Sequence, residues 1–200
     1  MLKSSRSEAH PPTGYLTGQL LISTPLVNTP GFSRAVIFMC SHDAEGAMGI
    51  ILNHVIENIS YKELFEQLSI EEKDGGSGAT TLPVHYGGPV EINRGFVIYH
   101  FEDVPYADTI LTVNKIAISS SIHLLRDIAE GKGPDERLLA LGYAGWGAGQ
   151  LELEMEANSW ISVPASRELI FGTDNDTKWE RAALSQGIDI HKLTSDVGHA

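Results

Sequence analysis

The glycine-rich run at residues 142–152, GYAGWGAGQLE, holds the residue types in this chain that are best suited to binding chemistry. It follows an apolar segment and precedes a series of helix formers. Backbone N–H groups at the start of a helix have no partner within that helix, so a glycine loop there can cradle a phosphate or a carboxylate. The same glycines can instead form a tight packing junction, because glycine permits positive φ and close backbone approach.

The spacing within this run favours packing over anion binding. It matches neither the dinucleotide-binding fingerprint nor the P-loop, because no Lys followed by Ser or Thr comes after it. Three glutamates follow at once and would repel an anion at a helix start, namely Glu152, Glu154 and Glu156. Trp146, in the middle of the run, is either a core residue or an exposed aromatic residue for binding.

Gly87-Gly88-Pro89 is a second candidate, with Tyr86 immediately before it. Two glycines before a proline favour an extended or turn conformation and let another backbone approach closely. The segment is either a strand-end turn or the wall of a pocket. Ligands of open α/β sheets bind near strand ends, so a pocket between this segment and the glycine run is one expectation.

A third candidate is built on histidine. His42-Asp43 lies in a predicted turn and Asn53-His54 ends the following strand. These side chains are expected either to meet across the base of a hairpin in a small polar site or to form a hydrogen-bonded surface turn. The candidate binding surface therefore comprises His42, Asp43, Asn53, His54, Tyr86, Gly87, Gly88, Pro89, Gly145, Trp146, Gly147 and Gln150.

Catalytic and metal-binding patterns do not appear in the sequence. None of the eight histidines has the spacing of a paired metal ligand, and Cys40 is the only cysteine. Cys40 lies in an apolar run and is expected in the core, as a free thiol typical of a reducing compartment. There is no nucleophile elbow. We therefore expect no catalytic residue, no metal and no cofactor.

The charge balance restricts the class of partner. Fourteen Lys and Arg face 26 Asp and Glu, which gives a formal net charge of −12, and the basic residues do not cluster. Nucleic acid and anionic membranes are therefore unfavourable partners. No apolar run reaches the ~18 residues of a membrane-spanning helix, and the N-terminus lacks the apolar centre of a secretory signal. The sequence predicts a cytoplasmic protein.

Hydrophobic periodicity predicts a single α+β domain over residues 14–187, with a mixed sheet, helices packed on it, and tails at 1–13 and 188–200. The apolar run at 34–41 indicates a central strand covered on both faces, with 46–53 as its hairpin partner. Ser60 and Glu63 form a capping box, and 71–82 is a polar loop. The other expected strands are 18–24, 94–100, 138–144 and 160–164, with strand structure in 108–120, and the expected helices are 61–69, 121–130, 150–157 and 176–186.

Five motifs in order resemble the YqgE/AlgH family of bacterial proteins: GQLLISTP at 18–25, GAMGIILN at 46–53, GGPV at 87–90, RGFV at 94–97 and the glycine run. The resemblance extends from about residue 14 to about residue 187. It implies a single α/β domain with a mixed sheet in a bacterial, cytoplasmic protein. The family has no established biochemical activity, and one branch is labelled a transcriptional regulator of alginate biosynthesis. The chain departs from the family pattern at His54-Val55, commonly Arg-Pro, and at 28–31, where an acidic residue is usual.

Two functional hypotheses follow. The first is a non-catalytic regulatory or protein-interaction domain, which binds a partner protein through the surface around Gly87–Val90 and Trp146. The alternative is a small-ligand-binding protein or enzyme with a pocket at the glycine-rich turns. Direct DNA binding is disfavoured by the acidic charge and by the absence of a DNA-binding motif.

Overall fold

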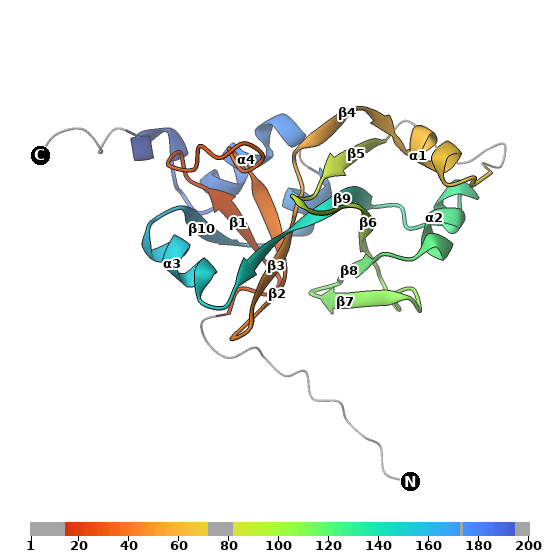
Figure 1. The fold of residues 1–200 in the computed structure, drawn as a ribbon, viewed down its shortest axis with the longest axis horizontal. Helices are drawn as coiled ribbons and strands as arrows, with labels where there is room; N and C mark the ends of the chain where they lie inside the picture. Colours follow the sequence, from red (N-terminus) through yellow and green to blue (C-terminus); the bar gives the residue numbers. More distant parts are fainter. Residues whose placement is uncertain (1–14, 72–81, 173, 195–200) are drawn as a thin grey trace, which may run out of the picture.

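The computed structural model describes residues 15–71, 82–172 and 174–194. The predicted tail at 1–13 and nearly all of the predicted loop at 71–82 lie outside the described residues. The described chain forms one mixed α+β fold, as the sequence predicts (Figure 1). Within it, no helix is long and apolar enough to cross a membrane.

The fold is built on one ten-stranded, curled sheet in the order β10-β1-β2-β3-β9-β6-β8-β7, with β5 also on β9 and β4 on β5. All pairs are antiparallel except β5 with β9, which makes the sheet mixed. The strands are β1 (Gln19–Ser23), β2 (Val36–Asp43), β3 (Gly46–Ile51), β4 (Val55–Ser60), β5 (Pro83–Tyr86), β6 (Val90–His100), β7 (Thr109–Val113), β8 (Ile116–Ser119), β9 (Arg137–Gly147) and β10 (Trp160–Pro164).

Strand β9 corrects the interpretation of the glycine run as a loop. The strand continues through Gly147, pairing first with β5 and β6 and then, from Ala144, with β3. Gly142, with φ of 74°, lies where β9 changes partners. Beyond it, Ala144 and Trp146 are buried while Gly145 and Gly147 are exposed. This alternation is the period of a strand, and the number of glycines conceals it.

The helices are α1 (Tyr61–Gln67), α2 (Ile122–Ala129), α3 (Gln150–Glu156) and α4 (Asn175–Leu184), with a π-helix η2 (Glu168–Gly172) and a 3-10 helix η3 (Ile190–Thr194). Figure 1 shows α3 at one end of the molecule and α1 and α2 at the other. The capping box of α1 is confirmed, because the Ser60 backbone N–H donates to Glu63 Oε2 (2.8 Å). The helical interpretation of 150–157 is also confirmed.

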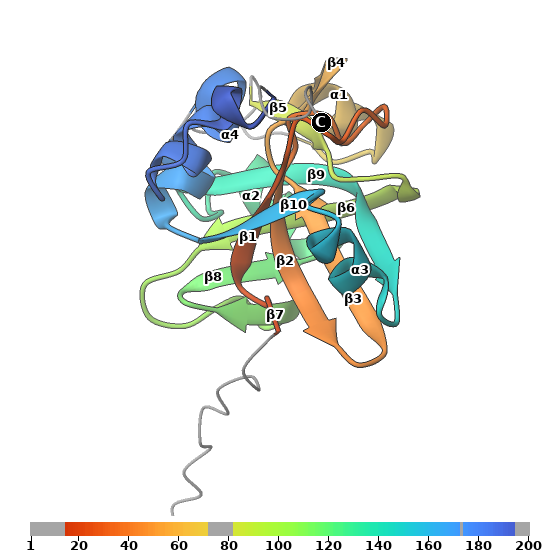
Figure 2. The ribbon, with the colours of Figure 1, turned by 90° about the vertical axis from the view of Figure 1, so that its left-hand side faces the viewer.

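Both faces of β2 are covered, as its continuous apolar sequence predicts. Val36 and Phe38 belong to the cluster that includes Trp179 of α4, whereas Ile37 and Met39 belong to the cluster that includes Leu151 of α3. Helices α4 and α3 therefore cover opposite faces of this part of the sheet (Figure 2). A third cluster lies under α1 and α2.

The C-terminal segment has regular structure within the range predicted as a tail, 188–200. Residues 190–194 form η3, and Ile190 is buried in the same cluster as Trp179. The His191 ring lies edge-on to the Trp179 indole, with centroids 6.1 Å apart. Ile188 also packs against this cluster, so apolar contacts hold the chain onto α4 beyond Gly187. Residues 195–200 lie outside the described residues.

Candidate functional site

A pocket of about 430 Å³ lies between the 26–32 segment, the end of β9 and helix α3. It brings together four of the sequence-predicted site residues, Pro89, Gly145, Trp146 and Gln150. Of the two segments expected to enclose a pocket, the glycine run contributes three of these residues and the Gly-Gly-Pro segment contributes Pro89. The rest of its lining was not predicted: Leu26, Val27, Asn28, Thr29, Phe32, Glu154, Ser159 and Trp160.

The carboxylate of Glu154 is the central polar group of this pocket. Its Oε2 accepts hydrogen bonds from two indoles, Trp146 Nε1 at 2.8 Å and Trp160 Nε1 at 2.7 Å. Its Oε1 accepts from Gln150 Nε2 at 2.9 Å. Three N–H donors thus fix the carboxylate, and none of the ion pairs among the described residues includes it.

Aromatic rings surround this carboxylate. The Trp146 and Trp160 rings meet edge to face with centroids 5.9 Å apart, and Phe32 meets Trp160 in the same way at 6.0 Å. The two indoles are nearly buried, with 7% and 6% of their surface exposed. Trp146 is therefore a core residue, the first of the two interpretations offered for it, and not an exposed aromatic residue; its edge contributes to the pocket lining.

Helix α3 positions Gln150 and Glu154 one turn apart on one face, while Leu151 points into the core. The Gly147 N–H donates to Gln150 Oε1 at 3.0 Å. That contact ties the end of β9 to the first residue of α3. Close backbone packing also surrounds the run, because a Cβ on Gly142 would lie 2.4 Å from the Gly88 carbonyl oxygen.

Gly87 and Gly88 are packing residues rather than pocket residues. A Cβ on Gly87 would lie 2.2 Å from the Gly142 carbonyl oxygen, and one on Gly88, where φ is 146°, would lie 2.2 Å from the Tyr143 carbonyl carbon. The backbone therefore crosses β9 in direct contact. Tyr86 is half-buried and packs in the α3-side cluster. Of this motif only Pro89 reaches the pocket.

The polar site proposed from His42, Asp43, Asn53 and His54 does not form. In the β2–β3 hairpin, His42 pairs with Ala47 at the turn, whereas Asn53 lies six residues further along the chain. At about 3.3 Å per residue, the two groups are about 20 Å apart. The error was to place both pairs at the same end of the hairpin.

Each of these four residues has a local structural role instead. The nearly buried His42 ring accepts from the Leu16 N–H at Nδ1 (3.1 Å) and contacts Glu152 Oε1 through Nε2 (3.0 Å). Asp43 Oδ1 accepts from the Glu45 N–H in the turn. Asn53 accepts from the Val36 N–H and donates to the Arg34 carbonyl. Burial lowers the pKa of His54, and hydrogen bonds to the backbone of Ser33, Gly31 and Arg34 offset only part of that shift.

Sequence reasoning missed Glu154, Trp160 and Phe32 as site residues. A signal for Glu154 was available, because Gln150 and Glu154 are four residues apart in a segment interpreted as helix. No local signal exists for the two aromatic residues. Trp160 reaches the pocket because β10 pairs with β1, where Ser23 lies opposite Trp160, and Phe32 reaches it through the irregular segment after β1.

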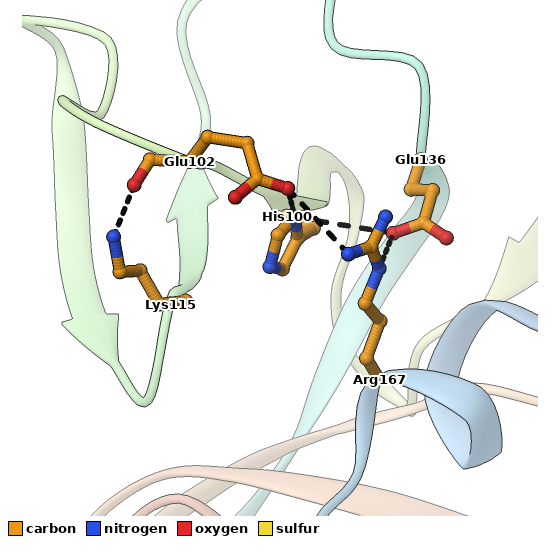
Figure 3. Close-up of polar contacts among 5 residues, drawn as sticks. All are labelled: His100, Glu102, Lys115, Glu136 and Arg167. Atoms are coloured by element: carbon orange, nitrogen blue, oxygen red, sulfur yellow. Dashed lines mark hydrogen bonds and ion pairs between the residues drawn. The ribbon is translucent and has the colours of Figure 1, made fainter.

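Two other polar groups of the fold lie outside the pocket. Figure 3 shows Arg167 between the carboxylates of Glu102 and Glu136. His100 Nδ1 lies 3.6 Å from Glu102 Oε1 and 3.9 Å from Glu136 Oε2. The Lys115 ammonium donates to the Glu102 carbonyl. These contacts join the ends of β6 and β9 to the segment before η2, and most of the charges are exposed.

Lys178 is the second group. It is buried, and its Nζ donates to the carbonyls of Leu169 and Ile170 at 2.8 and 2.7 Å. Burial lowers its pKa to about 8. The ammonium holds the backbone of η2 against α4. The thiol of Cys40 is likewise buried, and burial raises its pKa, so it is a core residue as predicted.

Comparison with known proteins identifies the family to which this chain belongs. The AlgH-like family model matches residues 20–191. The chain belongs to the AlgH-like family. It is 45% identical to a UPF0301 protein of Methylocella silvestris, over 93% of this chain and 92% of that one. It is 43% identical to a UPF0301 protein of Bradyrhizobium diazoefficiens, over 99% and 96% of the two chains.

Two solved structures share this fold. The solution structure of the AlgH protein from Pseudomonas aeruginosa matches with a TM-score of 0.74 and 34% identity, over the whole of both chains. A Corynebacterium diphtheriae protein shares the fold, with a TM-score of 0.68, 17% identity and coverage of 88% and 89%. The resemblance inferred from the five motifs is therefore confirmed. The family is uncharacterised, so the function has to be argued from the site.

Proposed function

We propose that this protein is a non-catalytic interaction domain with a regulatory role, which recognises a partner protein at the pocket around Glu154. The observation that carries the proposal is the composition of the pocket. Three aromatic residues and Pro89 supply rigid contact surface, and one fixed carboxylate supplies specificity. Tryptophan-rich, partly desolvated pockets are typical centres of protein recognition.

The surroundings of Glu154 support binding rather than acid–base chemistry. It is the one ionisable residue among those that line the pocket, so no second titratable group in the lining could restore its proton. A general acid or base usually works with such a partner. The regulatory label of one branch of the family is compatible with this role, exercised through a protein in the cytoplasm rather than by direct DNA binding.

Site-specific crosslinking tests the proposal. A photoreactive benzoylphenylalanine is placed at Leu26, which lines the pocket and is 51% exposed, or at Leu153, which is 67% exposed on α3 outside it. We expect a discrete protein adduct in cells from position 26 and none from position 153. Equal adducts from the two positions, or none from position 26 in a folded variant, would reject the pocket as the interface.

A small ligand is the second candidate. The pocket volume falls within the range of small-molecule sites. Native mass spectrometry of the purified protein, together with thermal shift across a metabolite panel, tests this alternative. A bound small molecule that Thr29→Trp removes would replace the partner protein in the proposal, because this change adds bulk to an exposed residue of the pocket lining.

A further inference from the structure

The geometry points to a cationic side chain, the guanidinium of an arginine or the ammonium of a lysine, as the group of the partner protein that enters the pocket. This inference deepens the proposed function and depends on it. Glu154 is the one ionisable residue in the lining and has no ion-pair partner among the described residues. An aromatic-walled pocket that contains one uncompensated negative charge is complementary to a cation and repels an anion.

The hydrogen-bonding capacity of Glu154 fits this occupant. A carboxylate offers about four lone-pair positions. Oε2 uses two of them for the indoles, and Oε1 uses one for Gln150. One position on Oε1 therefore remains. Asn28, Thr29 and Ser159 also line the pocket and add side-chain oxygens that can accept. An ammonium brings three donors and a guanidinium five, so each can use several of these acceptors at once.

The aromatic lining adds to this complementarity. Phe32, which is half-buried, lines the pocket and supplies a π system, which attracts cations and on which a guanidinium can stack. The carboxylate is held in one orientation by the two indole N–H groups, so binding does not have to order it. At longer range, the formal charge of −12 steers basic partners towards the molecule.

The tryptophans provide the readout. The indole N–H groups of Trp146 and Trp160 both donate to Glu154, whereas that of Trp179 donates to the Ser23 carbonyl in another cluster. Nitrogen-15 NMR therefore gives two reporters and one internal control. The protein is titrated with blocked tripeptides of the form acetyl-Ala-X-Ala-amide. X is arginine, lysine, the neutral isostere citrulline, or glutamate.

We expect saturable shifts of the Trp146 and Trp160 indole signals with the arginine and lysine peptides, and at least a tenfold weaker response to citrulline and glutamate. The Trp179 signal should not move. Glu154→Gln should weaken arginine binding at least tenfold, whereas Glu156→Gln, in the same helix but outside the pocket, should leave it unchanged. The comparison of arginine with citrulline uses the natural chain and stays decisive even if a variant fails to fold.

The outcomes separate the two proposals. Equal response to arginine and citrulline, or a non-saturating shift spread over exposed carboxylates, would overturn the cationic occupant. If the Leu26 crosslink still formed, the interaction domain would stand. Saturable arginine binding with no protein adduct at position 26 would overturn the partner protein as the source of the cation.

Discussion

Removal of the Glu154 carboxylate is the most direct test of how the pocket is built. Glu154→Ala leaves the indole N–H groups of Trp146 and Trp160 without their acceptor, at sites where 7% and 6% of the two residues is exposed. A hydrogen bond to a charged group contributes about 1.5–3 kcal/mol, and an unsatisfied buried donor costs about 1–3 kcal/mol. The pocket is open enough for water to replace part of this loss.

We therefore expect Glu154→Ala to lower the free energy of unfolding by about 2–4 kcal/mol, with a fall in Tm of roughly 5–15 °C for a chain of this size. Urea unfolding followed by far-UV circular dichroism measures the change. The matched control is Glu156→Ala, an exposed glutamate in the same helix, which should stay within about 0.5 kcal/mol. If the two variants lose the same stability, the hydrogen bonds from the two indoles to Glu154 do not contribute to stability as described.

Three further predictions address the frame around the pocket. Lys178→Met should remove the pH dependence that the Lys178 ammonium gives to stability. The pKa of Lys178 is about 8 in the folded chain and 10.5 in the unfolded chain, so the unfolded chain binds more protons between these two pH values. In parallel urea titrations, the free energy of unfolding of the wild type relative to the variant should therefore rise by roughly 3 kcal/mol from pH 8 to 10.5. Gly88→Ala should destabilise by several kcal/mol, on the order of 3 or more, because φ is 146° and the new Cβ meets the Tyr143 backbone at 2.2 Å; a thermal midpoint equal to that of wild type would contradict the described contact. Thr29→Trp should fold normally, because Thr29 is exposed, yet add bulk at the pocket lining; unchanged crosslinking from Leu26 would count against the site.

Much of the fold could be predicted because the deciding signals are local. The apolar run of β2 predicted burial on both faces, and the Ser60–Glu63 capping box located the start of α1. Residues 150–156 alternate apolar and acidic side chains, but their helix propensity decided the outcome. The strand predicted at 138–144 is confirmed as part of β9, but its continuation to Gly147 was interpreted as a loop, because the glycines conceal the period-two burial of Ala144 and Trp146.

The site could be predicted only in part, because long-range pairing assembles it. Gly145, Trp146 and Gln150 are neighbours in the sequence, and their association was recognisable. Phe32 and Trp160 join them only through the pairing of β1 with β2 and β10, which no local pattern specifies. The supposed histidine site failed for the same reason, since hairpin register, not sequence proximity, separates His42 from His54.

The pocket is fixed from both ends in the free protein, and this constrains how the proposed recognition can work. On one side, Gly87 and Gly88 hold Pro89 in place through direct backbone contact with β9. On the other, two indole N–H groups and Gln150 hold the Glu154 carboxylate. Both sets of contacts converge on β9, whose change of partners at Gly142 brings them together. Recognition at a site with walls fixed in this way requires little change of shape. Selectivity must then come from the charge and size of the occupant. A substitution at Gly88 that displaces β9 should weaken binding, although Gly88 itself does not line the pocket.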